Sequence, residues 1–502
     1  MYNSLAQSAQ EKIASSSLAN TCIYPASVCQ VEDTLIFLVN QNYKKLLVLL
    51  SPTDGVSKKF TGTIEEKGDD FITTCPLTTE NADALRALLP FTAPVAFGRQ
   101  AFSIGLGDRL GRASVGHLRI LKEAFPMVKP VLAQQSMREL VLTNRTYQDV
   151  LDSATWAVFQ EGWRGGFGAD GDHLKNLEDI LDALKLGYSM ITLDCSDEIE
   201  NSINLLSQEE LIESYEAFSQ DQRNAWEAEY LGTPIKLGEK NLPFDRLELA
   251  KNVLIYGKAI DHVKKIYQEA IIPCKRAIDF ELSIDETPTP TTPQAHYFVT
   301  NELKKQNVDL TSVAPRFCGE FQKGIDYIGD ISQFEKEFTL HAAIADHFGY
   351  RLSIHSGSDK FSVFPIIEKE TNGRVHVKTA GTNWLEALRL VAKKSPELLQ
   401  EMYTYALENF DEARKLYHVT TDLSLLPTPG NLSPEELEKL LVENDTRQVL
   451  HITYGILLNA KNSDGSFLFK DRFFDLLDRE EDAYADILKS HFHNHLAPLT
   501  KK

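Results

Sequence analysis

The sequence has no long apolar run and no excess of positive charge. No stretch approaches the ~20 consecutive apolar residues that a helix needs to cross a bilayer. Residues 1–17 also lack the basic start and apolar core of a secretory signal. The formal net charge is −20 at pH 7, which disfavours a nucleic-acid groove and binding to an anionic membrane surface. We therefore expect no nucleic-acid partner and no membrane partner.

Cysteine is scarce as well. The chain has six cysteines among its 502 residues, and no two of them form a CxxC pair. In a chain of this length such cysteines are typical of reduced, mostly buried thiols, which favours a cytoplasmic protein. The sequence also lacks a GxGxxG loop after a strand, so we expect no nucleotide cofactor.

With 43% hydrophobic and 25% charged residues, the chain has ample material for a large globular core. The first part, residues 1–98, reads as a β-rich accessory domain. Apolar runs rich in β-branched residues predict a hairpin and further strands there. The expected strands are 34–39, 45–50, 59–63 and 70–75, followed by a helix at 79–88.

Residues 99–395 alternate between strand and helix patterns, which predicts a parallel sheet with helical crossovers. A helical insertion is expected at about 205–270. The predicted strands are 102–106, 130–133, 167–169, 189–193, 277–283, 312–317, 351–354 and 374–379. Eight strands are the number that a (β/α)8 TIM-like barrel needs. The alternative is a doubly wound open sheet, which usually has fewer strands. Residues 396–502 are predicted to form a C-terminal helical region, with His491, His493 and His495 in a solvated tail.

Polar side chains gather where the predicted strands end. A barrel places its catalytic groups at the C-terminal ends of its strands. Two histidines with one carboxylate are a common ligand set for a catalytic divalent metal. We therefore predict a metal site formed by His173, Glu320 and His355, without distinguishing Zn, Mn, Ni and Co. Each histidine taken alone has a structural alternative, as an ordinary non-ligating residue.

The segment IDFELSIDE supplies a further candidate. Asp279, Glu281 and Ser283 share one face of this predicted strand, and apolar residues share the other. The polar face is expected to point into the barrel, where a carboxylate is costly to bury unless it is paired or functional. The structural alternative is a salt bridge inside the barrel, with Arg316 as the partner.

Five blocks together carry a resemblance: GLGDRLGRASVGH, GADGDHLK, IDFELSIDET, RFCGEFQKGIDY and HSGSDKFSVFP. In this order the sequence resembles the bacterial tagaturonate/fructuronate epimerase family of hexuronate catabolism. The resemblance implies a metal-dependent isomerase that inverts one hydroxyl-bearing carbon of a small hexuronate. It also implies that Asp172 is the proton acceptor and Glu281 the proton donor, with Asp279 as the alternative donor. His173, Glu320 and His355 fall in blocks that should supply the metal ligands.

The inverted carbon is β to the keto carbon, so simple enolisation cannot reach it. Retro-aldol cleavage, rotation and re-addition with a metal-held enediolate is one route, and transient oxidation by a nicotinamide is the other. Arg109 and Lys360 are candidates to hold the substrate carboxylate, and Gln134 and Asp359 complete the predicted substrate-binding set. A metal-dependent, class II type aldolase of sugar acids or ketoses is the alternative enzyme, and a sugar-binding protein is the non-enzyme alternative.

Overall fold

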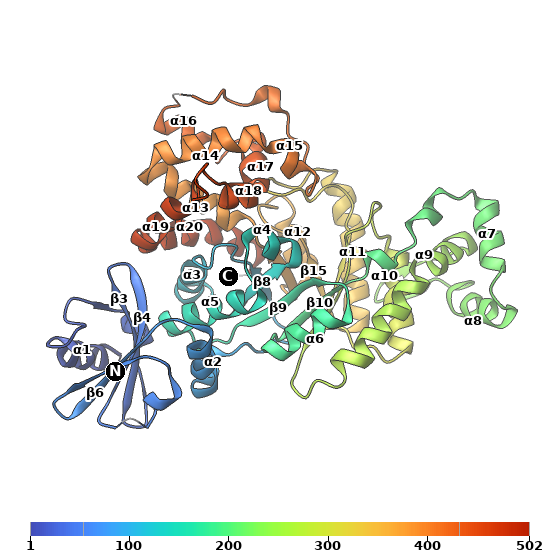
Figure 1. Ribbon diagram of the computed structural model, residues 1–502. Helices are drawn as coiled ribbons and strands as arrows, with labels where there is room; N and C mark the ends of the chain where they lie inside the picture. The colour runs from blue at the N-terminus through green and yellow to red at the C-terminus, as the bar shows by residue number, and fades with distance from the viewer. Residues whose placement is uncertain (1, 54, 431, 501–502) are drawn as a thin grey trace. The chain divides into compact units, whose positions relative to one another are not determined.

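The computed structural model describes residues 2–53, 55–430 and 432–500 (Figure 1). The chain forms two compact units. Unit 1 comprises Met1–Val95, Leu106–Phe167 and Ala380–Asn494, and unit 2 comprises Ala96–Gly105, Gly168–Thr379 and His495–Lys502. The predicted domain boundaries near residues 98 and 395 stay a prediction.

Unit 1 begins with a six-stranded antiparallel sheet in the order β1-β3-β4-β6-β5, with β2 paired to β3. Its elements are α1 (Tyr2–Ile13), β1 (Cys22–Ile23), β2 (Cys29–Val31), β3 (Thr34–Gln41), β4 (Lys44–Ser51), β5 (Thr63–Lys67) and β6 (Asp70–Cys75). Alternating apolar side chains bury both faces. Ile36 and Leu49 pack toward Trp156 and Phe159, while Val48 faces a second cluster that includes residues of α1.

Most of the predicted elements of this region are confirmed. The strands at 34–39, 45–50 and 70–75 lie within β3, β4 and β6, and the helix at 79–88 is α2 (Thr79–Leu88). The Thr78 side chain caps α2 by accepting a hydrogen bond from the Asn81 N–H. The strand expected at 59–63 is wrong, because Ser57–Lys59 form a 3-10 turn and β5 starts only at Thr63.

Eight strands close into a barrel in the order β10-β13-β14-β15-β16-β7-β8-β9. They are β7 (Ser103–Leu106), β8 (Lys129–Ser136), β9 (Gly168–Leu174), β10 (Met190–Asp194), β13 (Asp279–Ile284), β14 (Ser312–Pro315), β15 (Arg351–Ile354) and β16 (Val375–Thr379). The pairings from β9 through β16 along this order are parallel. The predicted (β/α)8 barrel is therefore confirmed, and the open doubly wound sheet is wrong.

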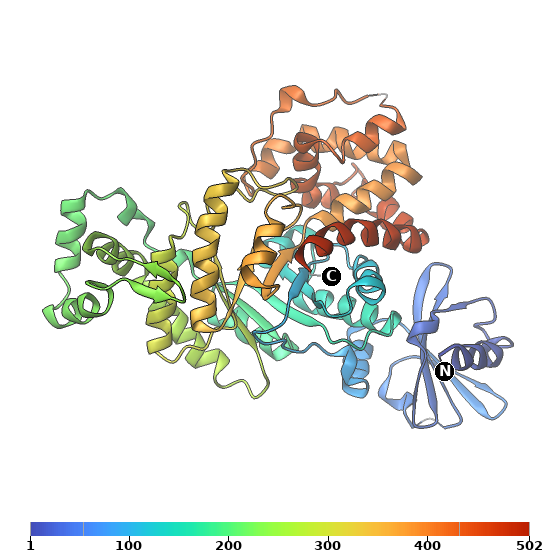
Figure 2. The ribbon, with the colours of Figure 1, turned by 180° about the vertical axis from the view of Figure 1, so that it is seen from behind.

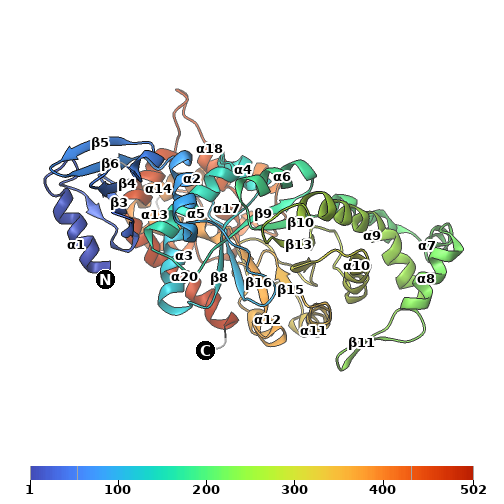
Figure 3. The same ribbon diagram turned by 90° about the horizontal axis from the view of Figure 1, so that it is seen from below.

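Helices connect the strands, as a parallel barrel requires. They are α3 (Ser114–Ala124), α4 (Met137–Thr143), α5 (Tyr147–Gln160), α6 (Leu177–Leu186), α10 (Pro293–Lys305), α11 (Ile331–Phe348), α12 (Phe364–Thr371) and α13 (Thr382–Lys394). Gly187 and Gly349 end α6 and α11 in left-handed backbone conformations, which glycine adopts without a Cβ penalty. In unit 2, α10, α11 and α12 lie outside β13, β15 and β16 (Figure 3).

The predicted helical insertion also belongs to unit 2. It consists of α7 (Gln208–Glu216), α8 (Gln220–Tyr230), a hairpin of β11 (Ile235–Leu237) and β12 (Lys240–Leu242), and α9 (Arg246–Ile266). In the view of Figure 2 the green helices α7 and α8 lie beyond α9 and α10. The insertion thus extends away from the strands of its own unit.

The C-terminal region is helical, as predicted. It contains α14 (Pro396–Glu408), α15 (Phe410–Arg414), α16 (Pro434–Lys439), α17 (Asn444–Ile452), α18 (Tyr454–Asn459), α19 (Lys470–Arg479) and α20 (Glu481–Leu499). The solvated tail is wrong: His491, His493 and His495 lie in α20, and His495 is fully buried. None of the described helices combines the length and apolarity needed to cross a membrane.

Candidate active site

Strand β9 carries the central acidic segment. Asp170 and Asp172 are two residues apart and share the inward face, so regular alternation would send His173 outward. The pairing with β10 shifts between Ile191 and Leu193, because three steps of β9 oppose two steps of β10. At this bulge His173 has φ 55°, a left-handed conformation that non-glycine residues seldom adopt. The bulge therefore turns the His173 side chain back toward the inward face of β9, on which Asp172 lies.

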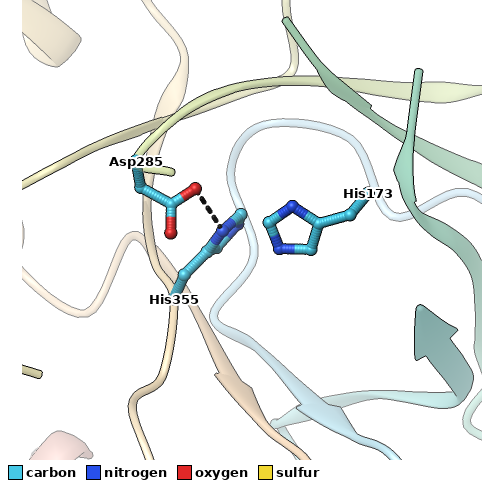
Figure 4. A group of neighbouring side chains, drawn as sticks. All are labelled: His173, Asp285 and His355. Atoms are coloured by element: carbon cyan, nitrogen blue, oxygen red, sulfur yellow. Dashed lines mark hydrogen bonds and ion pairs between the residues drawn. The ribbon is translucent and has the colours of Figure 1, made fainter. Parts of the chain in front are cut away.

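Three side chains from three strand ends converge there (Figure 4). His173 lies in β9, Asp285 directly follows β13, and His355 directly follows β15. One potential ligand atom from each lies within 4.8 Å of the others. His355 Nδ1 is 3.0 Å from Asp285 Oδ1, and the ring centroids of His173 and His355 are 4.8 Å apart. The structure thus brings the two predicted histidines together and adds Asp285.

The second nitrogen of each imidazole also faces a carboxylate. His355 Nε2 donates a 2.8 Å hydrogen bond to Glu281 Oε1, which leaves Nδ1 toward Asp285. A histidine that binds metal usually donates its other N–H to such a carboxylate. His173 Nδ1 is buried, lies 3.8 Å from Asp194 Oδ2 and has no hydrogen-bond partner. Both rings therefore have the orientation of metal-binding histidines, and Nδ1 of His173 is a buried nitrogen without a hydrogen bond.

Negative charge dominates this group. Burial disfavours the charged imidazole of His173, but the carboxylates led by Asp172 outweigh burial and raise its pKa to about 10. The same balance, led by Asp285, raises the pKa of His355. Burial opposes ionisation of Asp285, but His355 and His173 lower its pKa. Carboxylates that raise the pKa of two imidazoles make added positive charge favourable at this site, and two nitrogens with one oxygen suit a divalent transition metal.

Beneath these ligands lies Lys378, a residue that the sequence analysis missed. Its Nζ is 2.6 Å from Asp172 Oδ1, 2.9 Å from Asp170 Oδ2 and 3.1 Å from Glu281 Oε1. Burial raises the pKa of Asp172, but Lys378, His173 and His355 together outweigh burial and lower that pKa to about 2. Burial, opposed by Lys378, raises the pKa of Asp170 to about 6. The sequence VHVKT of β16 held the signal, because its polar residues alternate with valines as in β13.

Glu281 sits in a layer of inward-facing polar residues. Thr192 and Ser312 occupy the paired positions on the neighbouring strands β10 and β14, and both hydroxyls donate to its carboxylate. Glu281 is fully buried. Burial opposes its ionisation, but Lys378 and His355 hold its pKa well below the usual range. Its partner inside the barrel is thus Lys378 and not Arg316, whose Nη1 donates to the Thr287 carbonyl.

Glu320 lies apart from the two histidines. Strand β14 ends at Pro315, and Glu320 follows five residues later in a loop, where its backbone pairs with Ile328. Its side chain is 41% exposed, with Oε1 4.0 Å from Arg316 Nη2. Among the residues that the structure describes, Glu320 belongs to no candidate metal-binding group. Asp285, which follows its strand directly, lies beside the two histidines instead, and the ligand role of Glu320 stays a prediction.

Two other predicted residues, Asp359 and Lys360, serve the loops of unit 2. Lys360 is fully buried, and its ammonium donates to the carbonyls of Gln322, Ile325 and Ser358 at 2.6–2.9 Å. Asp359 has φ 60°, and its N–H donates to His495 Nε2 at 2.9 Å. These contacts fix the main chain of the loops that follow β14 and β15, and substrate binding by Asp359 and Lys360 stays a prediction.

The remaining candidates, Arg109 and Gln134, belong to unit 1. Arg109 is 2% exposed; its Nε and Nη2 donate to Glu139 Oε1, and its guanidinium lies 3.9 Å from the ring centroid of Tyr454. Arg109 Nη1 and both amide atoms of the buried Gln134 have no hydrogen-bond partner. Buried polar groups are rarely left without partners, so both side chains retain the capacity to bind a polar ligand.

Comparison with known proteins agrees with this geometry. A family model described as tagaturonate epimerase matches residues 24–499. The tagaturonate/fructuronate epimerase of Thermotoga maritima is 41% identical over 477 residues, covering 94% of this chain and 96% of that protein. The native crystal structure of the fructuronate-tagaturonate epimerase UxaE from Cohnella laeviribosi has a TM-score of 0.93 and 49% identity, covering 98% of this chain and 99% of that one. A glycerol complex of the same enzyme matches equally well. This chain therefore belongs to the tagaturonate epimerase family.

Proposed function

We propose that this protein interconverts D-tagaturonate and D-fructuronate with a divalent metal ion held by His173, Asp285 and His355. Both named relatives carry this activity in their names and match nearly the whole chain. The observation that carries the proposal is the convergence of the three ligands beside Asp172 at one end of the barrel. The small-molecule hexuronate is the partner that this site would take.

The metal fits the residues present. Three donor atoms lie within 4.8 Å of one another, and the second nitrogens of His173 and His355 each face a carboxylate that can orient the ring. When bound, a divalent ion supplies Lewis-acid stabilisation of negative charge on sugar oxygens. The donor set favours zinc, manganese, nickel or cobalt over calcium or magnesium, because two of its three atoms are imidazole nitrogens.

Asp172 is the proton acceptor in this proposal. Its carboxylate is ionised, lies 3.9 Å from His173 Nε2 and remains 8% exposed, so a substrate hydroxyl can reach it. Removal of that hydroxyl proton starts the retro-aldol route, in which the inverted carbon becomes an aldehyde, rotates and is attacked on its other face. The aldehyde must stay bound between these steps, so that it is attacked before it leaves the site.

Glu281 has a narrower role in this arrangement. The family resemblance makes it the proton donor, but here it is ionised and surrounded by Lys378, Ser312, Thr192 and His355. It can donate a proton only after it has accepted one during turnover. Its geometry favours the task of orienting His355, since it accepts the Nε2 hydrogen bond of that ring.

The test is to incubate the purified protein with D-tagaturonate, with and without chelator, and to measure D-fructuronate. We expect conversion in both directions, lost on chelation and restored by one of the four candidate metals. Net release of three-carbon fragments would instead support the metal-dependent aldolase. Binding without turnover at any metal would support a sugar-binding protein.

A further inference from the structure

Lys378 is the buried charged group to which the proposed chemistry gives no task. Its side chain, 6% exposed, comes from β16 and reaches two carboxylates of β9 and one of β13. We propose that Lys378 is a positioning residue that holds Asp172 and Glu281 in one arrangement. This inference rests on the proposed function, because it assigns the lysine a task toward the proposed proton acceptor and the carboxylate that orients His355.

The contacts of Lys378 leave it little freedom. Its Nζ has four oxygen neighbours: the three carboxylates at 2.6–3.1 Å and Thr192 Oγ1 at 2.6 Å. An ammonium group has three protons to donate, so these neighbours use all of them. Lys378 therefore links β9, β10 and β13 through fixed contacts, and it has no further N–H group with which to bind a substrate.

Without these contacts the carboxylates would not stay together. Three buried negative charges that share one partner repel one another strongly where water is excluded. Asp170 and Asp172 come from one strand, whereas Glu281 comes from the far side of β10 in the barrel order. The ammonium is the one cationic group that contacts all three within the described part of the chain. The arrangement of β9 relative to β13 at this level thus depends on Lys378.

The residues that Lys378 contacts are in turn linked to the proposed metal ligands. Lys378 holds Glu281, and Glu281 accepts the hydrogen bond of His355 Nε2 at 2.8 Å. Lys378 also holds Asp172, the residue next to His173. A displacement of about 1 Å in such a supporting group can cost about 10²-fold in rate. Loss of the lysine is therefore expected to reduce turnover without removing any group that touches the substrate.

The alternative hypothesis is that Lys378 only balances the charge of the three carboxylates. The double variant Lys378→Met/Asp170→Asn distinguishes the two hypotheses. Wild type has three carboxylates and one ammonium in this cluster, and the double variant has two carboxylates, so the net charge is −2 in both. The double variant keeps the carboxylates of Asp172 and Glu281, removes the ammonium that contacts both, and offsets its charge by neutralising Asp170.

The experiment measures kcat, KM, metal affinity and the crystal structure of Lys378→Met/Asp170→Asn, with Lys378→Met alone beside it. We expect kcat to fall about 10²-fold in both, KM to stay within about threefold, and metal affinity to stay within about tenfold. Asp172 or Glu281 should move by about 1 Å in the double variant. Arg351→Met is the matched control, because Arg351 is an equally buried cation of this barrel that contacts Asp279; its kcat per folded molecule should match wild type.

Two results would overturn the inference. If the double variant turns over within threefold of wild type, Lys378 only balances charge. If both carboxylates keep their positions, Lys378 does not position them, whatever the rate. The proposed function fails separately, when wild-type protein with metal does not convert D-tagaturonate; the crystal structure of the double variant then still decides the positioning role. If Lys378→Met does not fold, the charge-matched double variant decides alone.

Discussion

The two ends of the barrel strands in unit 2 each bury a cation against carboxylate, but with a different balance of charge. At the N-terminal ends, Arg351 lies 3.9 Å from a single carboxylate, Asp279. Arg351 Nη1 also donates to Ser103 Oγ and to the carbonyl of Ala101. Asp279 accepts two main-chain N–H groups, those of Phe97 and Gly98. Here one positive charge meets one negative charge, and the strand ends are clamped.

At the C-terminal ends the charges do not balance. Lys378 faces three carboxylates, and Asp194 and Asp285 add two more beside the imidazoles of His173 and His355. Lys175 Nζ lies 3.7 Å from Asp194 Oδ2, so five carboxylates meet two ammonium groups. A stable barrel does not require this excess of carboxylates, since a single pair of opposite charges, Arg351 and Asp279, holds the strands at the N-terminal end. A surplus of buried negative charge beside two imidazoles instead indicates where a cation binds. Both ends of the strands bury charged side chains. The proposed functional end differs from the other end in having an excess of negative charge.

The largest expected effect comes from removing a ligand at the unbalanced end. His173→Ala should lose bound metal and nearly all activity while the fold survives, because no other described residue replaces its nitrogen in the group. The matched control is His376→Ala, since His376 is buried at the balanced end, with Nδ1 2.8 Å from Ser103 Oγ. Metal content after dialysis and circular dichroism would be measured for both. Full metal occupancy in His173→Ala, or metal loss in His376→Ala, would break the comparison.

The next effect concerns Asp172. Asp172→Asn keeps the size of the side chain but removes the basic lone pair, and loss of a general base typically costs about 10²–10⁴-fold in rate. We expect this loss in kcat, with metal and substrate binding retained, from steady-state kinetics and calorimetry. Asp279→Asn at the balanced end should leave kcat unchanged per folded molecule. Near-normal turnover in Asp172→Asn would move the base to Asp170 or Glu281.

Much of this architecture could be predicted because it depends on local patterns. Strand β15 is predicted at its observed bounds, since Leu352 and Ile354 alternate with polar residues between Gly349 and the polar segment after Ile354. His173 and His355 were found for the same reason, as polar groups at strand ends. The sequence VHVKT has the same alternation as IDFELSIDE, so the same pattern also indicates that Lys378 faces inward.

The other differences needed information beyond local sequence. The position of Glu320 depends on a loop that pairs with Ile328 and is held by the contacts of Lys360. The direction of the His173 side chain depends on a β-bulge, and no residue type in this segment indicates a bulge. The burial of His495 depends on packing of α20 within the folded chain, whereas its sequence, HFHNHL, reads as a polar tail. Each miss thus comes from a contact between segments far apart in the sequence.

A smaller effect should appear in the pH dependence of metal binding. Surrounding carboxylates raise the pKa of His173 to about 10 and raise that of His355 in the metal-free protein. His173 therefore carries a proton at pH 7.5 and must lose it to bind metal, so binding releases a proton and affinity rises with pH. We expect about one proton released per ion and about 10-fold tighter binding per pH unit between pH 7 and 9. Calorimetry in buffers of different ionisation enthalpy would measure both; affinity that falls with pH would contradict the ligand set.

The smallest expected effect sharpens the choice of carboxylate. Asp285 Oδ1 lies 3.0 Å from His355 Nδ1, whereas Glu320 is 41% exposed and 4.0 Å from Arg316. Glu320→Gln should therefore change metal affinity by less than about threefold, because it removes only an exposed ion pair of little energetic weight. Asp285→Asn, the matched change at the unbalanced end, should weaken affinity by at least 10–100-fold, because it removes an anionic oxygen from the three-residue group. Isothermal titration of both variants against wild type decides. A large loss in Glu320→Gln with none in Asp285→Asn would require the loop after β14 to swing toward the histidines when metal binds, and would return Glu320 to the ligand set that the sequence predicts.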